Sequence, residues 1–443
     1  MPYQNRFRHQ PYTCDAPGAT YELLRPGGFP PPGSDEFARR MAAVGKALRA
    51  HRVRAIYLVH GTFAGWDALG LLAELDRYVP ALADVCRHGA KRVFDSVAGD
   101  VGNYTAAYAE TFERAINRAG EPHIHVRRFS WSGENHHIGR ADAAVRLLDE
   151  LLGMSSAHVV ASLRDATRVS ERLAHVCAHS EFNRVLLWGH SHAGNVFALM
   201  TNLLAGNQEC VAKFFRAARS FCRRWFLGRR ELPHWQRVRE ALQVRNAECG
   251  MRNDRRADAS LGHSAFRTPH SALLLDFVTF GTPIRYGWDT GGYGGLLHFI
   301  NHRPCDGLPP YRAPFPPREP DVRAAAHGDC VQQLGIAGTN FLPTLLSGRA
   351  LLADWRLGRL LQKGIRRRDL WARLCHGMRV PAEGTTLLVD YGPPGCNVVQ
   401  HLAGHAVYTR PEWMLLHAEE TVRRLYLSAD SPHAEATRPD GSG

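Results

Sequence analysis

The chain has 443 residues, of which 44% are hydrophobic and 22% charged, and its formal net charge is +13. This is the composition of an ordinary globular protein and argues against a fibrous or disordered chain. Zinc-finger spacing, aromatic RNA-binding motifs and compact basic runs are all missing, so we expect no nucleic-acid partner. The basic surface still suits acidic partners, and we keep peripheral contact with an anionic membrane as a hypothesis.

Cysteine usage and hydropathy indicate a cytoplasmic protein. The ten cysteines are scattered and include no Cys-x-x-Cys pair, which favours free thiols in a reducing compartment. Residues 1–13 are polar and lack the apolar core of a secretory signal. No run approaches the 18 apolar residues of a transmembrane helix.

The first part of the chain predicts an arm followed by alternating helices and strands. Residues 1–33 are rich in Pro and Gly and are expected to form an extended arm. Ser34 is a suitable N-cap for the helix that follows. The predicted elements are helices at 35–51, 69–82, 104–118 and 140–178, and strands at 53–59 and 123–129. This alternation is typical of a parallel α/β sheet.

The centre of the chain carries one conspicuous motif. The apolar run from Val185 ends in Gly189, and Ser191 then lies between two histidines, followed by Ala193 and Gly194. A helix is expected over 195–204. A strand, a tight turn with a serine and a helix form the layout of a nucleophile elbow, in which small neighbours allow the strained turn.

The second half continues the sheet but contains two insertions. Residues 206–268 are rich in Arg and predict helices at 210–227 and 235–245 and a polar loop at 246–268. Residues 303–380 begin with a proline-rich loop and continue as helices over 341–380. The remaining predictions are strands at 273–280, 296–300 and 386–390, a helix at 411–427 and a disordered tail at 428–443. We thus expect one domain over 34–427, with both insertions contributing to a helical cap.

The residues at the strand ends suggest acyl chemistry. A serine attacks a carbonyl only if a base takes its proton and donors hold the oxyanion. Ser191 is the candidate nucleophile. His60-Gly61 ends the strand at 53–59 and fits an oxyanion loop, in which the amide of Thr62 or Phe63 would act together with that of His192.

The base is expected in the loop after the last strand, where His405 is best placed. His401 is the nearer rival, and His417 falls within the terminal helix. The orienting acid is expected at Asp329, between the last two strands, which gives the order Ser, Asp, His. Three aspartates remain as alternatives: Asp306, Asp289 and Asp390. We expect neither a metal nor a cofactor.

These motifs resemble those of the α/β-hydrolase superfamily, on its lipase and esterase side. The resemblance runs from about Val53 to Leu427 and is closest to uncharacterised bacterial members. It rests on His60-Gly61-Thr62-Phe63, Phe129-Ser130-Trp131-Ser132-Gly133, Gly189 to Gly194, Phe280-Gly281-Thr282-Pro283 and Gly404-His405.

The resemblance implies an eight-stranded, mostly parallel sheet. It also implies Ser191 as nucleophile, His405 as base, and Thr62 or Phe63 with His192 as oxyanion donors. Asp329 corresponds to the acid of the family only by its position between the last two strands, since no motif marks it. The departures are Ala193, where the motif has glycine, and the two insertions.

The first functional hypothesis is a serine hydrolase that cleaves a small-molecule or lipid carboxylic ester. Aromatic residues at 214–226 alternate with arginines, which would suit an acyl chain and an anionic group, but an amphipathic helix with a solvated basic face is the favoured interpretation. The alternatives are a non-catalytic scaffold used for binding and an acyltransferase with the same residues. The oligomeric state and the substrate do not follow from the sequence.

Overall fold

The computed structural model describes most of the chain between residues 20 and 427. The described residues are 20–62, 65, 86, 89, 95–96, 99–118, 120–164, 183–205, 208–222, 231–253, 265–268, 271–283, 285–337, 340, 343, 348–362 and 367–427. Several predictions therefore lie outside them, wholly or in part: the arm up to residue 19, the helix at 69–82, residues 165–178 and 223–227 of two predicted helices, residues 254–264 of the polar loop, the oxyanion candidate Phe63 and the tail at 428–443.

Eight strands of the described chain form one sheet. Its order is β1-β8-β7-β6-β4-β2-β3, with every neighbouring pair parallel, and β5 pairs antiparallel with β6 off this path. The strands are β1 (Tyr21–Leu24), β2 (Val53–Val59), β3 (His125–Phe129), β4 (Asn183–His190), β5 (Ala265–Thr268), β6 (Ser271–Phe280), β7 (Gly295–Asn301) and β8 (Thr385–Val389).

The central strands are apolar on both faces because helices cover both faces. Leu186 of β4 lies beside Ile56 of β2, and Trp188 lies beside Leu58 on one side and Val278 of β6 on the other. All five side chains are buried. Continuous apolar runs of this kind are characteristic of parallel strands enclosed between helical layers.

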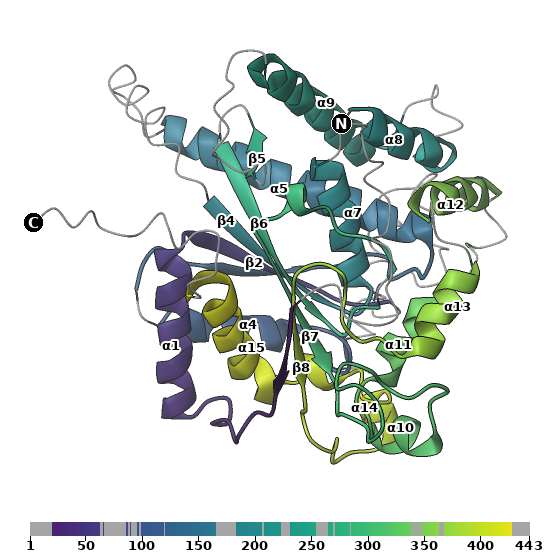
Figure 1. The fold of residues 1–443 in the computed structure, drawn as a ribbon. Coiled ribbons are helices and arrows are strands. Elements are labelled where there is room, and N and C mark those ends of the chain that lie inside the picture. Colours follow the sequence, from purple (N-terminus) through teal and green to yellow (C-terminus); the bar gives the residue numbers. More distant parts are fainter. Residues whose placement is uncertain are drawn as a thin grey trace, which may run out of the picture.

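Helices form a layer on each face of the sheet (Figure 1). One layer contains α1 (Asp35–Ala50), α4 (Ala106–Ile116) and α15 (Met414–Val422), with α1 in contact with the other two. The other contains α5 (His137–Arg164) and α7 (Ala193–Ala205). The Ser34 hydroxyl accepts the Phe37 amide 3.2 Å away, as the predicted N-cap requires.

The insertions build an outer helical layer on the α5–α7 face. Helices α8 (Gln208–Cys222) and α9 (Pro233–Asn253) pack on each other, α9 packs on α5, and α12 (Gly348–Leu361) packs on α8 and α5. Elsewhere α10 (Glu319–Ala324) contacts α14 (Val398–His401), and α11 (Cys330–Ala337) contacts α13 (Arg367–His376). Short helical turns are η1 (Thr290–Gly292), η2 (Val407–Thr409), η3 (Pro411–Trp413) and η4 (Arg423–Leu427).

The aromatic residues of α8 belong to the core. Phe214 and Phe215 are buried against Trp235 of α9, whereas Arg216 and Arg219 are exposed. This is the amphipathic helix with a solvated basic face that the sequence favoured. None of the helices in the described part of the chain combines the length and the apolar character that crossing a bilayer requires.

Two strands depart from the predicted pattern. Tyr21–Leu24, within the expected arm, form the edge strand β1 along β8. Ala265–Thr268, within the expected polar loop, form β5 along β6, and α9 extends to Asn253 where that loop was expected to have begun. Both strands have only four residues, so their local sequence carries little signal. β1 in addition depends on β8, near the other end of the chain, whereas β5 pairs with β6, the strand that directly follows it.

Candidate active site

The site candidates lie where the strand order reverses. β2 lies between β3 and β4 in the sheet. The chain leaves β2 towards β3 on one side and leaves β4 towards β6 on the other, so these two connections run in opposite directions. In open parallel sheets such a reversal opens a crevice outside the carboxyl ends of the strands, where ligands bind. His60 to Thr62 follow β2, and Ser191 follows β4.

Ser191 has the strained backbone of a sharp strand-to-helix turn. Its φ is 56°, which is unfavourable for a residue with a Cβ. Its amide donates to the carbonyl of Phe280 at 2.8 Å, and its own carbonyl accepts the Thr282 hydroxyl at 2.8 Å. These two bonds attach the turn to the end of β6 and offset the strain.

Close packing explains the small residues around this turn. A Cβ at Gly189 would lie 2.4 Å from the ring of Phe197, and one at Gly194 would lie 2.3 Å from the Thr282 hydroxyl. Ala193 is fully buried, so its methyl group is accommodated at the position where the motif has glycine.

The loop after β2 abuts the serine. A Cβ at Gly61 would lie 2.6 Å from the Cβ of Ser191. His60 holds this loop in place, because its Nε2 accepts the Trp131 amide at 3.2 Å and its carbonyl accepts the Trp131 indole N–H at 2.8 Å. Its proton is therefore on Nδ1, which lies 2.9 Å from the carbonyl of Gly61.

Two of the three candidate oxyanion donors lie in the described part of the chain. Neither the amide of Thr62 nor that of His192 donates a hydrogen bond to another residue that the structure describes. An oxyanion hole requires such N–H groups, held by their surroundings but not already bonded. The third candidate, Phe63, is outside the described residues.

Asp329 and His405 are directly bonded across the ends of β7 and β8. The Nδ1 of His405 lies 2.7 Å from Oδ2 of Asp329, which also accepts the Tyr408 hydroxyl at 2.9 Å. The other oxygen, Oδ1, accepts the Gln332 amide at 2.8 Å. The Asp329 amide in turn donates to the carbonyl of Asn301 at the end of β7.

Charge and hydrogen bonding keep Asp329 ionised. Complete burial by itself raises the pKa of this carboxyl, but His405 and the Gln332 amide outweigh burial and leave the pKa below its ordinary value. A carboxylate that accepts Nδ1–H of an imidazole sets the orientation of the ring and the tautomer of its neutral form, in which Nε2 carries the lone pair. In that tautomer Nε2 of His405 is the nitrogen that can accept a proton.

That nitrogen has no partner in the described structure. The Nε2 of His405 is buried and forms no hydrogen bond, so it is not bonded to the Ser191 hydroxyl. The serine turn and the His405 loop nevertheless adjoin, because the ring of His190 lies 4.6 Å from that of His405, centroid to centroid. Catalytic hydrogen bonds are often long in unliganded enzymes.

The alternative acids have other partners. Asp390 accepts Nε of Arg303 at 2.7 Å. Asp289 caps η1 by accepting the Gly291 amide at 3.0 Å. Asp306 is exposed at the surface. None of the three is hydrogen-bonded to the predicted base in the described structure.

The alternative bases are buried but directed elsewhere. A ring nitrogen of His401 lies 3.0 Å from the carbonyl of Arg323, and one of His417 lies 2.7 Å from the Tyr391 hydroxyl. Burial lowers the pKa of His417 to about 3. His417 packs among aromatic rings of the core.

Sequence reasoning did not single out several residues that hold this arrangement. The Tyr408 hydroxyl donates to the same oxygen of Asp329 as His405 does, and the ring of His190 packs against that of His405. Asn195 donates to Nδ1 of His192 at 3.0 Å and to the carbonyl of Pro283 at 2.9 Å. The position of Asn195 in the first turn after the elbow was the one available signal.

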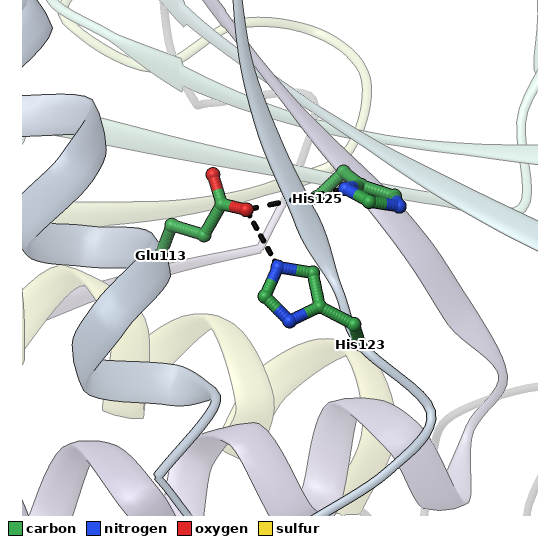
Figure 2. A group of neighbouring side chains, drawn as sticks. All are labelled: Glu113, His123 and His125. Atoms are coloured by element: carbon green, nitrogen blue, oxygen red, sulfur yellow. Dashed lines mark hydrogen bonds and ion pairs between the residues drawn. The ribbon is translucent and has the colours of Figure 1, made fainter.

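One described group could hold a divalent cation (Figure 2). Nε2 of His123 and Nδ1 of His125 lie 2.6 and 3.9 Å from Oε1 of Glu113, whose Oε2 accepts the Val126 amide. His125 begins β3, so the group lies at the amino end of an edge strand, whereas Ser191 follows the carboxyl end of β4. Its internal hydrogen bonds already explain its arrangement.

One hollow in the described structure lies elsewhere. It has a volume of about 620 Å³ and is lined by residues of α8 and α9, among them Val211, Phe215, Arg216, Arg219 and Arg239. None of the candidate catalytic residues lines it.

Comparison of the chain with protein-family models, curated proteins and solved structures gives no match. A function therefore has to be argued from the geometry of the site.

Proposed function

We propose that this chain is a serine hydrolase with an α/β-hydrolase topology, which cleaves carboxylic esters through an acyl-enzyme on Ser191. His405 acts as the general base and Asp329 orients it. The amides of His192 and of Thr62 or Phe63 hold the oxyanion. The alternating parallel sheet and the elbow at the strand reversal support this assignment.

One observation carries the proposal. A buried carboxylate and an imidazole are bonded at 2.7 Å, and the other nitrogen of that imidazole is unpartnered. A buried polar atom without a hydrogen bond is costly and requires an explanation. A general base whose partner is a reacting hydroxyl provides one, and the strained serine adjoins the same loop.

The reaction follows from these roles. The Ser191 oxygen attacks the ester carbonyl while its proton moves to Nε2 of His405, and the amide donors stabilise the negative charge on the former carbonyl oxygen. Collapse of this intermediate breaks the ester C–O bond, and the leaving alkoxide takes the proton from His405. Water then enters, loses a proton to His405 and releases the acid from the serine.

Acyl transfer is the second candidate function, because an acceptor alcohol in place of water uses the same residues. A non-catalytic scaffold is the third. The missing hydrogen bond between Ser191 and His405 is the observation that favours it, although unliganded enzymes commonly show the same feature.

The deciding experiment is labelling with a fluorophosphonate, which reacts with activated serines. We expect labelling of the wild-type protein and none of Ser191→Ala. Ser220→Ala is the matched control, because that hydroxyl only donates to the Arg349 carbonyl at 3.1 Å on the outer layer. Equal labelling of wild type and Ser191→Ala would leave the scaffold as the remaining candidate.

Turnover then separates hydrolysis from acyl transfer. With p-nitrophenyl butyrate as substrate, a hydrolase releases nitrophenol and butyrate in equal amounts in water alone. A transferase releases butyrate slowly and forms a new ester when an alcohol such as glycerol is added. Chromatographic analysis of the acyl product therefore distinguishes the two functions.

A further inference from the structure

Two buried arginines near Ser191 have no acidic partner among the residues that the structure describes. Arg140 of α5 and Arg285 of the loop after β6 are 0% and 5% exposed. In the described part of the chain no carboxylate oxygen lies within 4 Å of either guanidinium. Buried charges in proteins are normally paired, because leaving water is costly for an ion.

Arg140 is held entirely by neutral groups. Its Nε donates to the Tyr286 hydroxyl at 2.9 Å, and its two terminal nitrogens donate to the amide oxygens of Asn135 and Asn340 at 2.9 and 2.5 Å. Its guanidinium also lies 5.4 Å from the centre of the Tyr286 ring. These contacts fix the position of the positive charge and leave it uncompensated.

Arg285 lacks even neutral partners in the described part of the chain. Its Nε and Nη1 are buried and form no hydrogen bond with any residue that the structure describes. Burial, and after it the charge of Arg140, lowers the pKa of Arg285 to about 10, so the group is still a cation at neutral pH. A buried cation with unused donors is the usual complement of a bound anion.

The nearby carboxylates do not supply that anion. Asp354 interacts electrostatically with Arg285, but beyond ion-pair distance, and its Oδ1 accepts the Ile138 amide at 2.9 Å. Glu134 accepts the Ser132 hydroxyl at 2.9 Å and lies 3.0 Å from Nε2 of His136. Both carboxylates are thus committed to other groups.

The loop that carries Arg285 is attached to the serine turn. Asn195 bonds this loop twice: it donates to the Pro283 carbonyl at 2.9 Å and accepts the Tyr286 amide at 3.2 Å. The same Asn195 donates to His192, the residue after Ser191. Burial lowers the pKa of His192 well below its ordinary value, and Arg140 and Arg285 are the next causes, so both cations lie close to the elbow.

We propose that Arg140 and Arg285 form a subsite for an anionic group of the substrate, a carboxylate or a phosphate, which lies on the same small molecule as the ester that Ser191 attacks. This inference rests on the proposed function and narrows its substrate class to acidic esters. Arg285 supplies the free donors, and Arg140 adds the fixed charge that makes the region attractive to an anion.

The first test is binding, which requires no catalysis. In the Ser191→Ala protein we expect succinate or inorganic phosphate to raise the melting temperature, and Arg285→Met to abolish that increase. The preferred anion indicates whether the subsite suits a planar carboxylate or a tetrahedral phosphate. Arg216→Met on the exposed face of α8 is the matched control and should leave the increase unchanged.

The stability of the unliganded protein gives a second readout. Without a ligand, Arg285 is a buried and unsatisfied charge, so Arg285→Met should raise the melting temperature. A structural arginine would behave in the opposite way. Absence of any anion-induced shift, together with a lower melting temperature for Arg285→Met, would overturn the subsite. Failure of Arg285→Met to fold would count against the proposal, because it would indicate a structural role for the arginine. Arg285→Lys would then be tested: a folded Arg285→Lys protein without an anion-induced shift would show that the cation is needed only for folding.

Kinetics separate this inference from the proposed function. We compare kcat/KM for the p-nitrophenyl monoester of succinate with that for p-nitrophenyl butyrate, and we expect Arg285→Met to lower the ratio at least tenfold while Arg285→Lys recovers part of it. An unchanged ratio would refute the subsite and leave the hydrolase intact. If neither ester is cleaved but anions still bind through Arg285, the hydrolase proposal fails and the anion site remains.

Discussion

The imidazole rings of His190 and His405 are packed against each other, 4.6 Å apart, and Nε2 of His190 lies 2.9 Å from the backbone carbonyl of His405. Nδ1 of His190 lies 3.1 Å from the carbonyl of Gly102. Burial, followed by the influence of His405, lowers the pKa of His190 to about 3, so this ring is neutral at ordinary pH. His190 therefore connects the strand of the serine to the loop of the base.

We expect His190 to be a positioning residue. His190→Phe removes the contact with the His405 carbonyl, and a buried hydrogen bond contributes about 1 kcal/mol, so kcat should fall about fivefold with little change in KM. His190→Gln, which retains an N–H donor, should recover part of the loss. Steady-state kinetics on p-nitrophenyl butyrate provide the measurement.

His298→Phe is the matched control for this change. His298 is equally buried, and its ring nitrogens lie near the Thr279 hydroxyl and the Glu383 carbonyl, away from the candidate site. Both phenylalanine variants should lower the melting temperature, but only His190→Phe should lower kcat. Equal kinetic losses would show that His190 acts through general stability.

The acid is tested by Asp329→Asn. The amide keeps the shape of the side chain but no longer holds the His405 proton on Nδ1, and loss of this orientation in a serine–histidine–acid triad lowers kcat by about 10⁴-fold. Asp390→Asn and Asp306→Asn should retain near wild-type turnover. If Asp306→Asn or Asp390→Asn abolishes turnover while Asp329→Asn does not, the assignment of the acid is wrong.

The interior strands and the longer described helices of this fold could be predicted because their signals are local, whereas the short helices α10, α11 and α14 were not predicted. The apolar runs at 53–59 and 185–188 can be read from the sequence, and Ser34 marks the start of α1. The strands β1 and β5 could not, since each has only four residues and therefore shows no clear alternating or apolar pattern. β1 has the additional difficulty that its partner, β8, lies near the other end of the sequence, so no local pattern indicates the pairing.

The same distinction applies to the candidate site. Ser191 and the His60-Gly61 loop follow strands, so their placement at one edge of the sheet could be inferred from the order of the elements. Tyr408 and Arg285 could not be identified in this way. Their proposed roles depend on which groups surround each side chain, and that is decided by the packing of loops far apart in the sequence.

Buried histidines predict a loss of stability in mild acid. Burial lowers the pKa of His417 to about 3, whereas an unfolded histidine takes up a proton near pH 6.5. Between these values the unfolded state binds more protons, so the free energy of unfolding falls as the pH falls from about 6.5 towards 3. Each such histidine contributes at most about 1.4 kcal/mol per pH unit.

Urea denaturation at pH 8, 6 and 5 measures this slope. His417 packs against Phe280 and Phe299, so His417→Phe fits an aromatic surrounding and removes one titrating group. Loss of the hydrogen bond to Tyr391 should destabilise the variant by about 1–3 kcal/mol at pH 8. Between pH 6 and 5 its free energy of unfolding should nevertheless fall less steeply with decreasing pH than that of the wild type. The difference corresponds to the uptake of at most one proton on unfolding. Identical slopes would show that His417 does not stay neutral in the folded protein.

Gly61→Ala tests the contact between the oxyanion loop and the elbow. The new methyl group would lie 2.6 Å from the Cβ of Ser191 and 3.3 Å from Nδ1 of His190, so the loop or the serine must move. Displacement by a fraction of an ångström misaligns the oxyanion donors, and loss of one such donor costs about 10²- to 10³-fold in kcat. We therefore expect a decrease in kcat of at least tenfold, with KM changed much less.

Gly153→Ala is the control for the added methyl group. A Cβ at Gly153 in α5 meets no atom within 4 Å, and alanine is the better helix former by about 1 kcal/mol. This variant should be as active as the wild type and slightly more stable. Wild-type kcat in Gly61→Ala would mean that the loop after β2 tolerates displacement, and the oxyanion donors would then have to come from another part of the chain.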